Sequence, residues 1–100
     1  MLIVNTTYQV SEQFENEWKN WVLSEYIPEV TSSGMLVNPG FFRLLIENEA
    51  NTVSYALQFQ TQSFETLEKW FEKFGTELQH GMSKRFDDKV LGFTTLMESV

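Results

Sequence analysis

The chain has 100 residues, a formal net charge of −7 and no cysteine. This length predicts one domain over residues 1–100, and the absence of cysteine excludes disulfides, thiol catalysis and cysteine-based zinc sites. The seven basic residues are scattered, so this acidic protein is expected to bind neither nucleic acid nor a membrane surface. The apolar start Met1–Val4 is too short for a signal peptide, and no apolar run of about 18 residues could span a membrane. We therefore expect a cytoplasmic protein.

A strand is predicted over residues 2–10, followed by a helix. Apolar residues alternate through this strand with uncharged polar ones, which is the pattern of a sheet with one covered face. Ser11 is expected to cap the helix, and its core stripe consists of Phe14, Trp18, Trp21 and Val22. Pro28 should end or kink this helix, and a short helical turn can restart there because the first helical position needs no N–H donor.

Two further strands form a predicted hairpin. The segment 31–40 contains Gly34 and an Asn-Pro-Gly sequence and is expected to be a loop, after which residues 41–48 form the second strand. The turn Glu49–Asn51 leads into a third strand from Thr52. One face of this strand is apolar and consists of Val53, Tyr55, Leu57 and Phe59. The other face has small or polar residues: Thr52, Ser54, Ala56, Gln58 and Gln60.

The second helix follows at once and carries a long aromatic stripe. Ser63 is its expected N-cap, and the helix should run to about Phe86, where Asp87 and Asp88 interrupt the pattern. Its predicted core-facing residues are Phe64, Leu67, Trp70, Phe71, Phe74 and Leu78. Residues 89–98 form the last predicted strand.

The order strand, helix, strand, strand, helix, strand is that of the ferredoxin-like α+β fold, βαββαβ. We expect a four-stranded antiparallel sheet with the first and third strands at its centre and both helices on one face. The first strand then gives the open face Ile3, Asn5, Thr7 and Gln9. One arrangement of the edge strands turns the following residues toward the helices: Phe42, Leu44, Ile46, Leu91, Phe93 and Met97. In that arrangement the open face gains Phe41, Arg43, Leu45, Glu47, Val90, Gly92, Thr94, Leu96 and Glu98.

Three segments carry a resemblance to a known family of about this length. They are the run Tyr26–Val30 leading to Gly34, the strand segment Arg43-Leu44-Leu45, and the C-terminal run Phe93–Glu98. With these segments the chain resembles a family that is catalogued as a domain of unknown function. The family is similar in fold to the dimeric α+β barrel proteins, in which two ferredoxin-like sheets pack face to face. That superfamily includes cofactor-free monooxygenases of the antibiotic-biosynthesis type and haem-degrading enzymes.

The resemblance implies a homodimer formed through the open sheet face. It also implies a difference in chemistry, because relatives usually have His at the position of Tyr26 and Arg or Lys at the position of Thr94. A phenol has an ordinary pKa near 10, so Tyr26 does not inherit the role of a general base.

Few residues suggest catalysis or metal binding. His80 is the one histidine, with Glu77 three residues before it, and it can be either a candidate base or an exposed helix residue. No His pair and no carboxylate cluster has ligand spacing, so we expect no metal and no cofactor. There is also no glycine-rich phosphate loop and no nucleophile elbow.

The candidate ligand-binding residues are Asn5, Thr7, Tyr26, Arg43 and Gln58. Arg43 can bind a carboxylate, or it can pair with Glu47 or Glu98 across strands. Tyr26, with Trp18 and Trp21, can line a pocket between helix and sheet or simply fill the core. The amides of Asn5 and Gln58 and the hydroxyl of Thr7 can hold a ligand inside the barrel or bond across the dimer.

Two functions follow, and the lack of a convincing acid–base set favours the first. The first is a homodimer that binds a small apolar or acidic metabolite in a barrel or helix–sheet pocket, without chemistry of its own. The alternative is a cofactor-free, monooxygenase-like enzyme that uses Asn5, Tyr26, Arg43 and His80. An inward-pointing Arg43 or His80 favours the enzyme, and both in solvent favour the binding protein.

Overall fold

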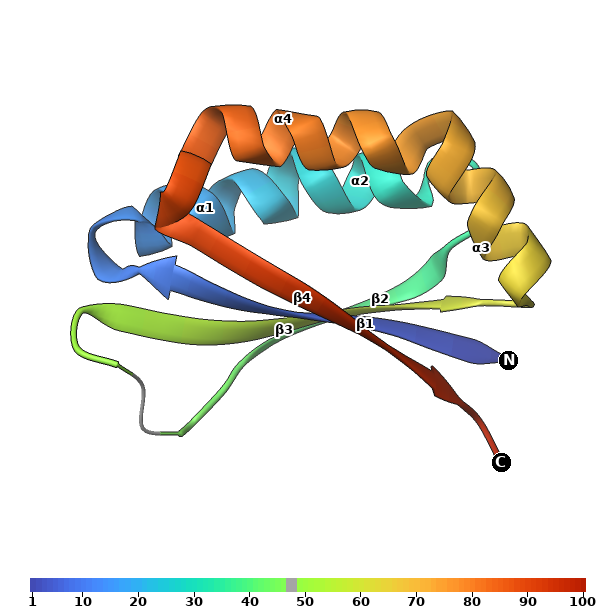
Figure 1. Cartoon of the computed structure of the whole chain (residues 1–100), viewed down its shortest axis with the longest axis horizontal. Helices are drawn as coiled ribbons and strands as arrows, with labels where there is room; N and C mark the ends of the chain where they lie inside the picture. The colour runs from blue at the N-terminus through green and yellow to red at the C-terminus, as the bar shows by residue number, and fades with distance from the viewer. Residues whose placement is uncertain (47–48) are drawn as a thin grey trace.

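The computed structural model describes residues 1–46 and 49–100, and it has the predicted ferredoxin-like α+β architecture. Four antiparallel strands form one sheet in the order β2-β3-β1-β4, and the helices lie on one face of it (Figure 1). The strands are β1 (Leu2–Ser11), β2 (Val37–Arg43), β3 (Thr52–Thr61) and β4 (Val90–Glu98). The helices are α1 (Glu15–Trp21), α2 (Ile27–Thr31), α3 (Phe64–Trp70) and α4 (Thr76–Phe86). The prediction that the first and third strands are central is confirmed.

The register of the sheet fixes which residues face the helices. Tyr8 of β1 lies opposite Tyr55 of β3 on one side and opposite Gly92 of β4 on the other. Because side chains alternate along a strand, the even-numbered residues of β1 and the odd-numbered residues of β3 turn toward the helices. Both predicted apolar faces are therefore confirmed.

The first helical segment does not end at Pro28. Short 3-10 structure over Glu12–Phe14 leads into α1, and a π-helical turn over Val22–Tyr26 connects α1 directly to α2. The amide of Ile27 bonds to the carbonyl of Val22, five residues back. This wider turn accommodates a proline one residue later, since the usual clash of a proline ring is with the carbonyl four residues back. Ser11 stands at the predicted N-cap position, at the start of the 3-10 segment, but its side chain makes no capping hydrogen bond.

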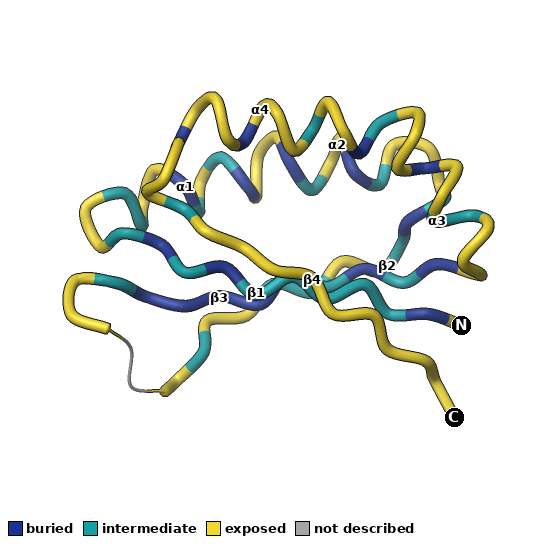
Figure 2. Tube along the Cα trace, viewed as in Figure 1, coloured by how far each residue is buried: buried dark blue, intermediate teal, exposed yellow. Residues whose placement is uncertain are grey.

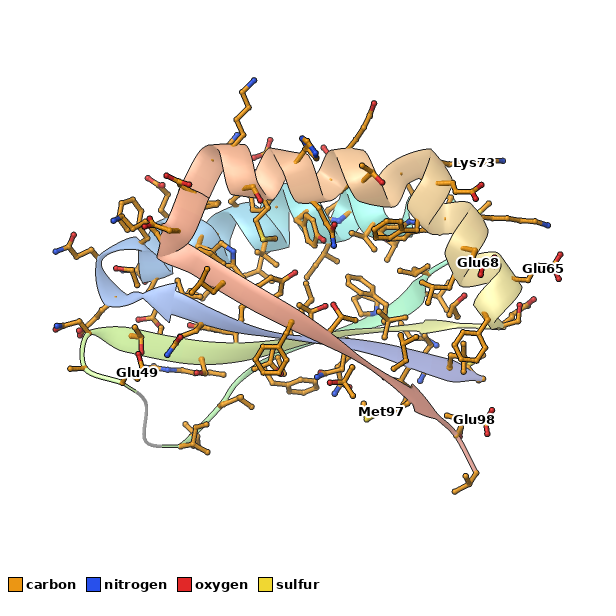
Figure 3. The ribbon with its side chains drawn as sticks, in the orientation of Figure 1. Glu49, Glu65, Glu68, Lys73, Met97 and Glu98 are labelled. Carbon is orange, nitrogen blue, oxygen red and sulfur yellow. The ribbon has the colours of Figure 1, made fainter. Side chains whose placement is uncertain are left out.

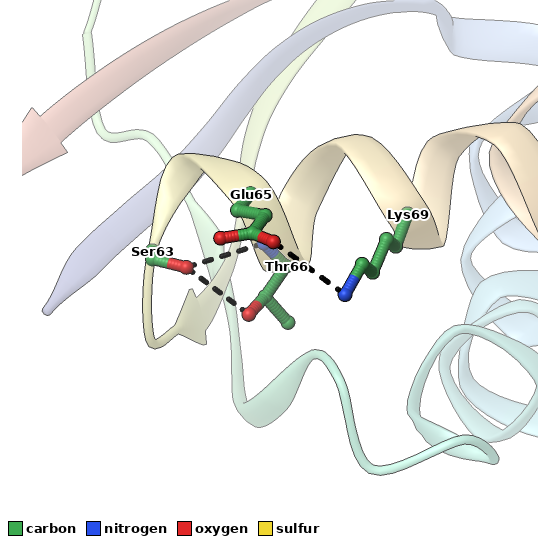
Figure 4. Close-up of polar contacts among 4 residues, drawn as sticks. All are labelled: Ser63, Glu65, Thr66 and Lys69. Carbon is green, nitrogen blue, oxygen red and sulfur yellow. Dashed lines mark hydrogen bonds and ion pairs between the residues drawn. The ribbon is translucent and has the colours of Figure 1, made fainter.

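The second helical segment begins where the sequence indicated. Ser63 Oγ accepts a hydrogen bond from the backbone N–H of Thr66 at 3.2 Å, and Lys69 pairs with Glu65 at 3.6 Å (Figure 4). A second π-helical turn over Phe71–Gly75 joins α3 to α4, which ends at Phe86 as predicted. Asp87 then adopts a positive φ of 52° and turns the chain into β4 through the 3-10 turn Asp87–Lys89.

The predicted bounds and orientation of the second strand are wrong. β2 covers residues 37–43 rather than 41–48, and Glu47 and Asn48 lie outside the described residues. Phe41 pairs with Leu57 and Phe42 with Ala56, so Phe41 and Arg43 face the helices while Phe42 faces the open side. A register shift between Val37 and Gly40 precedes these pairs. The run Phe41–Ile46 is apolar at almost every position, so its alternation could not indicate the face.

The orientation considered for the last strand is wrong as well. Val90, Gly92, Thr94 and Leu96 face the helical side, because they pair with Val10, Tyr8, Thr6 and Val4 of β1. The open face instead receives Leu91, Phe93, Thr95 and Met97, and Met97 lies on the side of β4 away from the helices (Figure 3). The strand is exposed along almost its whole length (Figure 2).

An aromatic part of the core lies between α1 and the β2–β3–β1 side of the sheet. Trp18 is fully buried there, and its ring contacts those of Tyr8, Phe41 and Tyr55 at centroid distances of 5.1, 5.6 and 5.3 Å. Such tilted and edge-on aromatic contacts stabilise beyond the apolar area that they bury. Trp18 therefore anchors α1 to the sheet.

Candidate functional site

A groove of about 860 Å³ lies between the helices and the β4 side of the sheet, and we call it the helix–sheet groove. Its floor comes from the helix-facing residues of β1, β3 and β4, and its walls from α2, α3, α4 and the two π-helical turns. The lining is mainly apolar. Its apolar members are Val4, Val30, Leu36, Leu57, Phe59, Phe64, Leu67, Trp70, Phe71, Met82, Val90, Gly92 and Leu96.

The groove explains why part of the aromatic stripe stays exposed. Phe64 and Phe71 were predicted to pack in the core, but they are 59% and 42% exposed and line the groove instead. Trp70 is buried, and its indole N–H donates to the carbonyl of Val30 at 3.1 Å. This bond connects the wall formed by α3 to α2.

Both π-helical turns border the groove. Tyr26 is the last residue of the first turn, and Phe71 begins the second. A π-helical turn adds one residue to the helical repeat and rotates the following side chains, which is why such turns are frequent at functional sites. Gly75 closes the second turn, where an added Cβ would lie 2.8 Å from the rings of Trp70 and Phe71. The close packing of these rings against the backbone thus depends on glycine.

Four hydroxyl groups form the polar part of the interior. The hydroxyls of Thr6 and Thr94 bond to each other at 2.9 Å on the floor. Burial raises the pKa of Tyr8 well above its ordinary value, and the neighbouring Tyr26 hydroxyl raises this pKa further. Burial also raises the pKa of Tyr26, and a hydrogen bond with Tyr8 partly offsets the rise. Both phenols are therefore neutral at physiological pH, where they act as hydrogen-bonding groups rather than bases.

Gly92 determines how the Tyr8 ring lies. A Cβ at this position would stand 2.8 Å from two carbons of that ring, closer than real contacts allow. The ring of Tyr8 is thus held between β4 on one side and Trp18 on the other, with its hydroxyl directed to Tyr26. The small residue in β4 consequently positions one of the polar groups of the groove.

The edge of the groove is acidic. Glu68 and Glu72 belong to the lining and are exposed, and Gln79 and Ser83 of α4 complete the polar edge. No Lys, Arg or His is present among the described residues that line the groove. The site can therefore bind an apolar body and offers hydroxyls within and carboxylates at its opening.

Of the five predicted binding residues, Tyr26 alone lines this groove. Asn5, Thr7 and Gln58 lie together on the open face of the sheet, where the amide of Asn5 donates to the hydroxyl of Thr7 at 3.4 Å. The carbonyl oxygen Oδ1 of Asn5 is buried and has no hydrogen-bond partner within the described part of the chain. These three residues thus belong to a second surface, on the opposite side of the sheet.

Arg43 lies on the helix-facing side, outside the groove. Its Nε is 3.8 Å from a carboxylate oxygen of Glu15 in α1, and Tyr55 donates a hydrogen bond to the same oxygen at 2.7 Å. Arg43 therefore points to α1 and pairs with Glu15 rather than with Glu98. The other predicted partner, Glu47, lies outside the described residues. His80 is exposed on α4 and does not line the groove.

Sequence reasoning missed most of the groove. Thr6 and Thr94 are 88 residues apart in the chain, and only the register of β1 against β4 brings their hydroxyls together. Tyr26 and Thr94, the two positions at which the resemblance implied a difference from relatives, both line the groove. A signal was available on α3 and the start of the π-helical turn after it. There the sequence has the spacing of one helix face, and this face lines the groove: Phe64, Leu67, Glu68, Phe71 and Glu72.

Two classes of site are not found in the described residues. No three His, Asp or Glu side chains gather there at metal-binding distances. None of the described helices is long and apolar enough to cross a bilayer.

A comparison with models of protein families establishes which family the chain belongs to. The model described as a domain of unknown function, DUF4286, matches residues 1–100. The chain belongs to this family. The resemblance inferred from the sequence is thereby confirmed. A comparison of this DUF4286 chain with curated proteins finds no match.

Solved structures support the fold of the DUF4286 chain. HapK from Hahella chejuensis is 12% identical with a TM-score of 0.75, and the match covers 100% of this chain and 93% of that one. A dimeric ferredoxin-like protein from an uncultured marine organism is 16% identical with a TM-score of 0.69, covering 100% and 95%. A putative antibiotic biosynthesis monooxygenase from Deinococcus radiodurans is 12% identical with a TM-score of 0.68, covering 100% and 93%. At these identities the likeness shows the ferredoxin-like fold alone.

Proposed function

We propose that the chain is a single-domain homodimer that binds a small apolar molecule in the helix–sheet groove and performs no chemistry of its own. The observation that carries the proposal is the groove itself. Its volume of about 860 Å³ lies within the range of about 300–1,000 Å³ that is typical of small-molecule sites. A mainly apolar wall with a few directed hydroxyls is also the usual composition of such sites.

The distribution of ionisable groups favours binding over catalysis. A monooxygenase-like enzyme would need a base beside its substrate, and the groove interior offers only Tyr8 and Tyr26, whose pKa values are both raised. Arg43 is engaged with Glu15, and its side chain is 57% exposed, while His80 is exposed on α4. Both residues are outside the groove, which is the arrangement expected for a binding protein.

The open sheet face supports the homodimer. Its described strand residues include no charged side chain, although the whole chain carries a net charge of −7. Phe42 and Phe93 stand at its two edges, 54% and 69% exposed, with Ala56 and Thr7 between them in the same row. Repulsion between two acidic copies is least where they meet through a surface that carries no charge, and exposed apolar patches of this kind mark interfaces. The unpartnered Asn5 Oδ1 would receive its donor from the second copy.

Ligand binding can be tested with the neutral apolar fluorophore N-phenylnaphthylamine and a variant that fills the groove. Thr94→Trp places a large side chain on the floor at an exposed position, so it should fold and abolish the fluorescence increase. His80→Trp adds the same side chain on α4 outside the groove and should bind the probe normally. Equal binding by both variants would contradict the groove as the site. Native mass spectrometry of the freshly purified protein would identify a retained natural ligand by its mass.

The homodimer can be tested separately by light scattering after gel filtration. Phe93→Glu puts a charge onto the open face and should give monomers. Leu23→Glu makes the same kind of change at a residue that is 53% exposed on the helical layer, and it should leave the dimer intact. A wild-type protein that is monomeric at all concentrations tested would overturn this part of the proposal.

A further inference from the structure

The two glutamates at the opening of the helix–sheet groove are placed there by the helical repeat. Glu68 lies one position after Leu67, and Glu72 one position after Phe71, so both stand at the margin of the apolar face that forms the wall. Both side chains therefore border the groove where its apolar lining meets solvent.

These carboxylates are not held in ion pairs among the described residues. Within the part of the chain that the structure describes, Lys69 pairs with Glu65 at 3.6 Å, and neither Glu68 nor Glu72 has an ion-pair partner. In Figure 3, Glu65 and Lys73 point outward from the helical end of the molecule. Two like charges on one helical segment repel each other, and a cation beside them would reduce that repulsion.

Among the described residues, the interior of the groove has no group that would compensate the charge of an anionic ligand. The hydroxyls of Thr6 and Thr94 bond to each other, and those of Tyr8 and Tyr26 interact with each other. A carboxylate or phosphate entering the groove would meet no cation among the lining residues and would lose its hydration without compensation. Trp70, Phe71 and Phe64 instead present aromatic rings, which attract cations as well as apolar groups.

We propose, on the basis of the binding function above, that the ligand of the helix–sheet groove is an apolar amine. Its hydrophobic body lies between the helices and the sheet, and its ammonium group lies at the opening beside Glu68 and Glu72. This choice narrows the class of ligand, because an acidic metabolite is disfavoured by the same arrangement.

Three probes with the same ring system and different head groups test the proposal: naphthylethylamine, naphthylethanol and naphthylacetic acid. Their Kd values can be measured by calorimetry at neutral pH and low salt. An exposed ion pair contributes roughly 1.5- to 5-fold in affinity, so two carboxylates should favour the amine over the alcohol by about two- to thirtyfold. The acid should bind most weakly, and high salt should reduce the advantage of the amine.

Variants assign the preference to its residues. The double variant Glu68→Gln/Glu72→Gln should bind amine and alcohol almost equally, with the Kd of the alcohol unchanged. Glu65→Gln removes one negative charge from the same helix on its outward side, and it should keep the preference. All three positions are exposed, so these variants should fold.

The outcomes separate the two proposals. Equal affinities for the three probes, tightest binding of the acid, or a preference that survives the double variant would overturn the amine and leave the groove as a binding site. If none of the three probes binds, or if Thr94→Trp binds them as well as the wild type, the groove is not the binding site and both proposals fail.

Discussion

Replacing Tyr55 by Phe tests how α1 is held on the sheet. The Tyr55 hydroxyl donates to Glu15 at 2.7 Å, and Arg43 approaches the same carboxylate at 3.8 Å. A hydrogen bond to a charged group contributes about 1.5–3 kcal/mol. Because Glu15 keeps Arg43 and some contact with water in the variant, we expect the lower end, a loss of about 1.5 kcal/mol. For a domain of this size, that loss lowers Tm by about 6–12 °C.

The same contact predicts a pH dependence. Burial and then the neighbouring Glu15 raise the pKa of Tyr55 to about 12. Between pH values of about 10 and 12, the unfolded chain loses the tyrosine proton while the folded chain keeps it. The unfolded state then binds fewer protons, so stability falls as pH rises. Two pKa units correspond to at most about 2.7 kcal/mol, and partial contact with water reduces this to about 1–2 kcal/mol.

Urea unfolding of wild type and Tyr55→Phe at one fixed protein concentration measures both effects. The gap in the free energy of unfolding should be about 1.5 kcal/mol at neutral pH and should largely close near pH 12. Tyr8 and Tyr26 titrate in both proteins, so their contributions cancel in the difference. A double-mutant cycle with Glu15→Gln should give a coupling energy of about 1 kcal/mol. A gap that is absent at neutral pH, or that does not change with pH, would refute the reasoning.

Three further substitutions test the elements around the groove. Gly92→Ala should lower stability by about 1–3 kcal/mol and weaken binding of the apolar probe, because the new Cβ displaces the Tyr8 ring. Gly81→Ala is the matched control, since nothing lies within 4 Å of its added Cβ, and denaturation should show a protein at least as stable as wild type. Ser63→Ala removes the cap of α3 and should cost about 1 kcal/mol in the same assay. Trp70→Phe leaves a carbonyl of α2 without its 3.1 Å bond and should cost about 1–3 kcal/mol, measured by urea unfolding.

The fold could be predicted where the sequence has one apolar face per element. β1 and β3 alternate clearly between apolar and polar residues, and their faces and central positions are as predicted. β4 has large apolar residues on both faces, Leu96 on one and Phe93 on the other, so a period of two gives no orientation. The pairing of Gly92 with Tyr8 decides which face of β4 turns toward the helices. That pairing exists only in the assembled sheet.

The groove could be predicted far less well than the fold. Its polar groups come from β1, the first π-helical turn and β4, and nothing in their local sequence links them. The π-helical turns themselves have weak sequence signals. Pro28 suggested a break near the first turn, but it did not indicate that the helix continues with one extra residue.

The exposure of β4 connects the two proposals. A long edge strand that is apolar on both faces invites unwanted association unless something covers it. The second copy would cover the face that carries Phe93, and the ligand would cover the face that carries Thr94. Because these neighbours point to opposite sides of the sheet, Phe93→Glu should impair dimerisation and Thr94→Trp should impair binding, each without the other effect. If either substitution abolished both properties, the shared requirement would be the pairing of β4 with β1 rather than two separate surfaces.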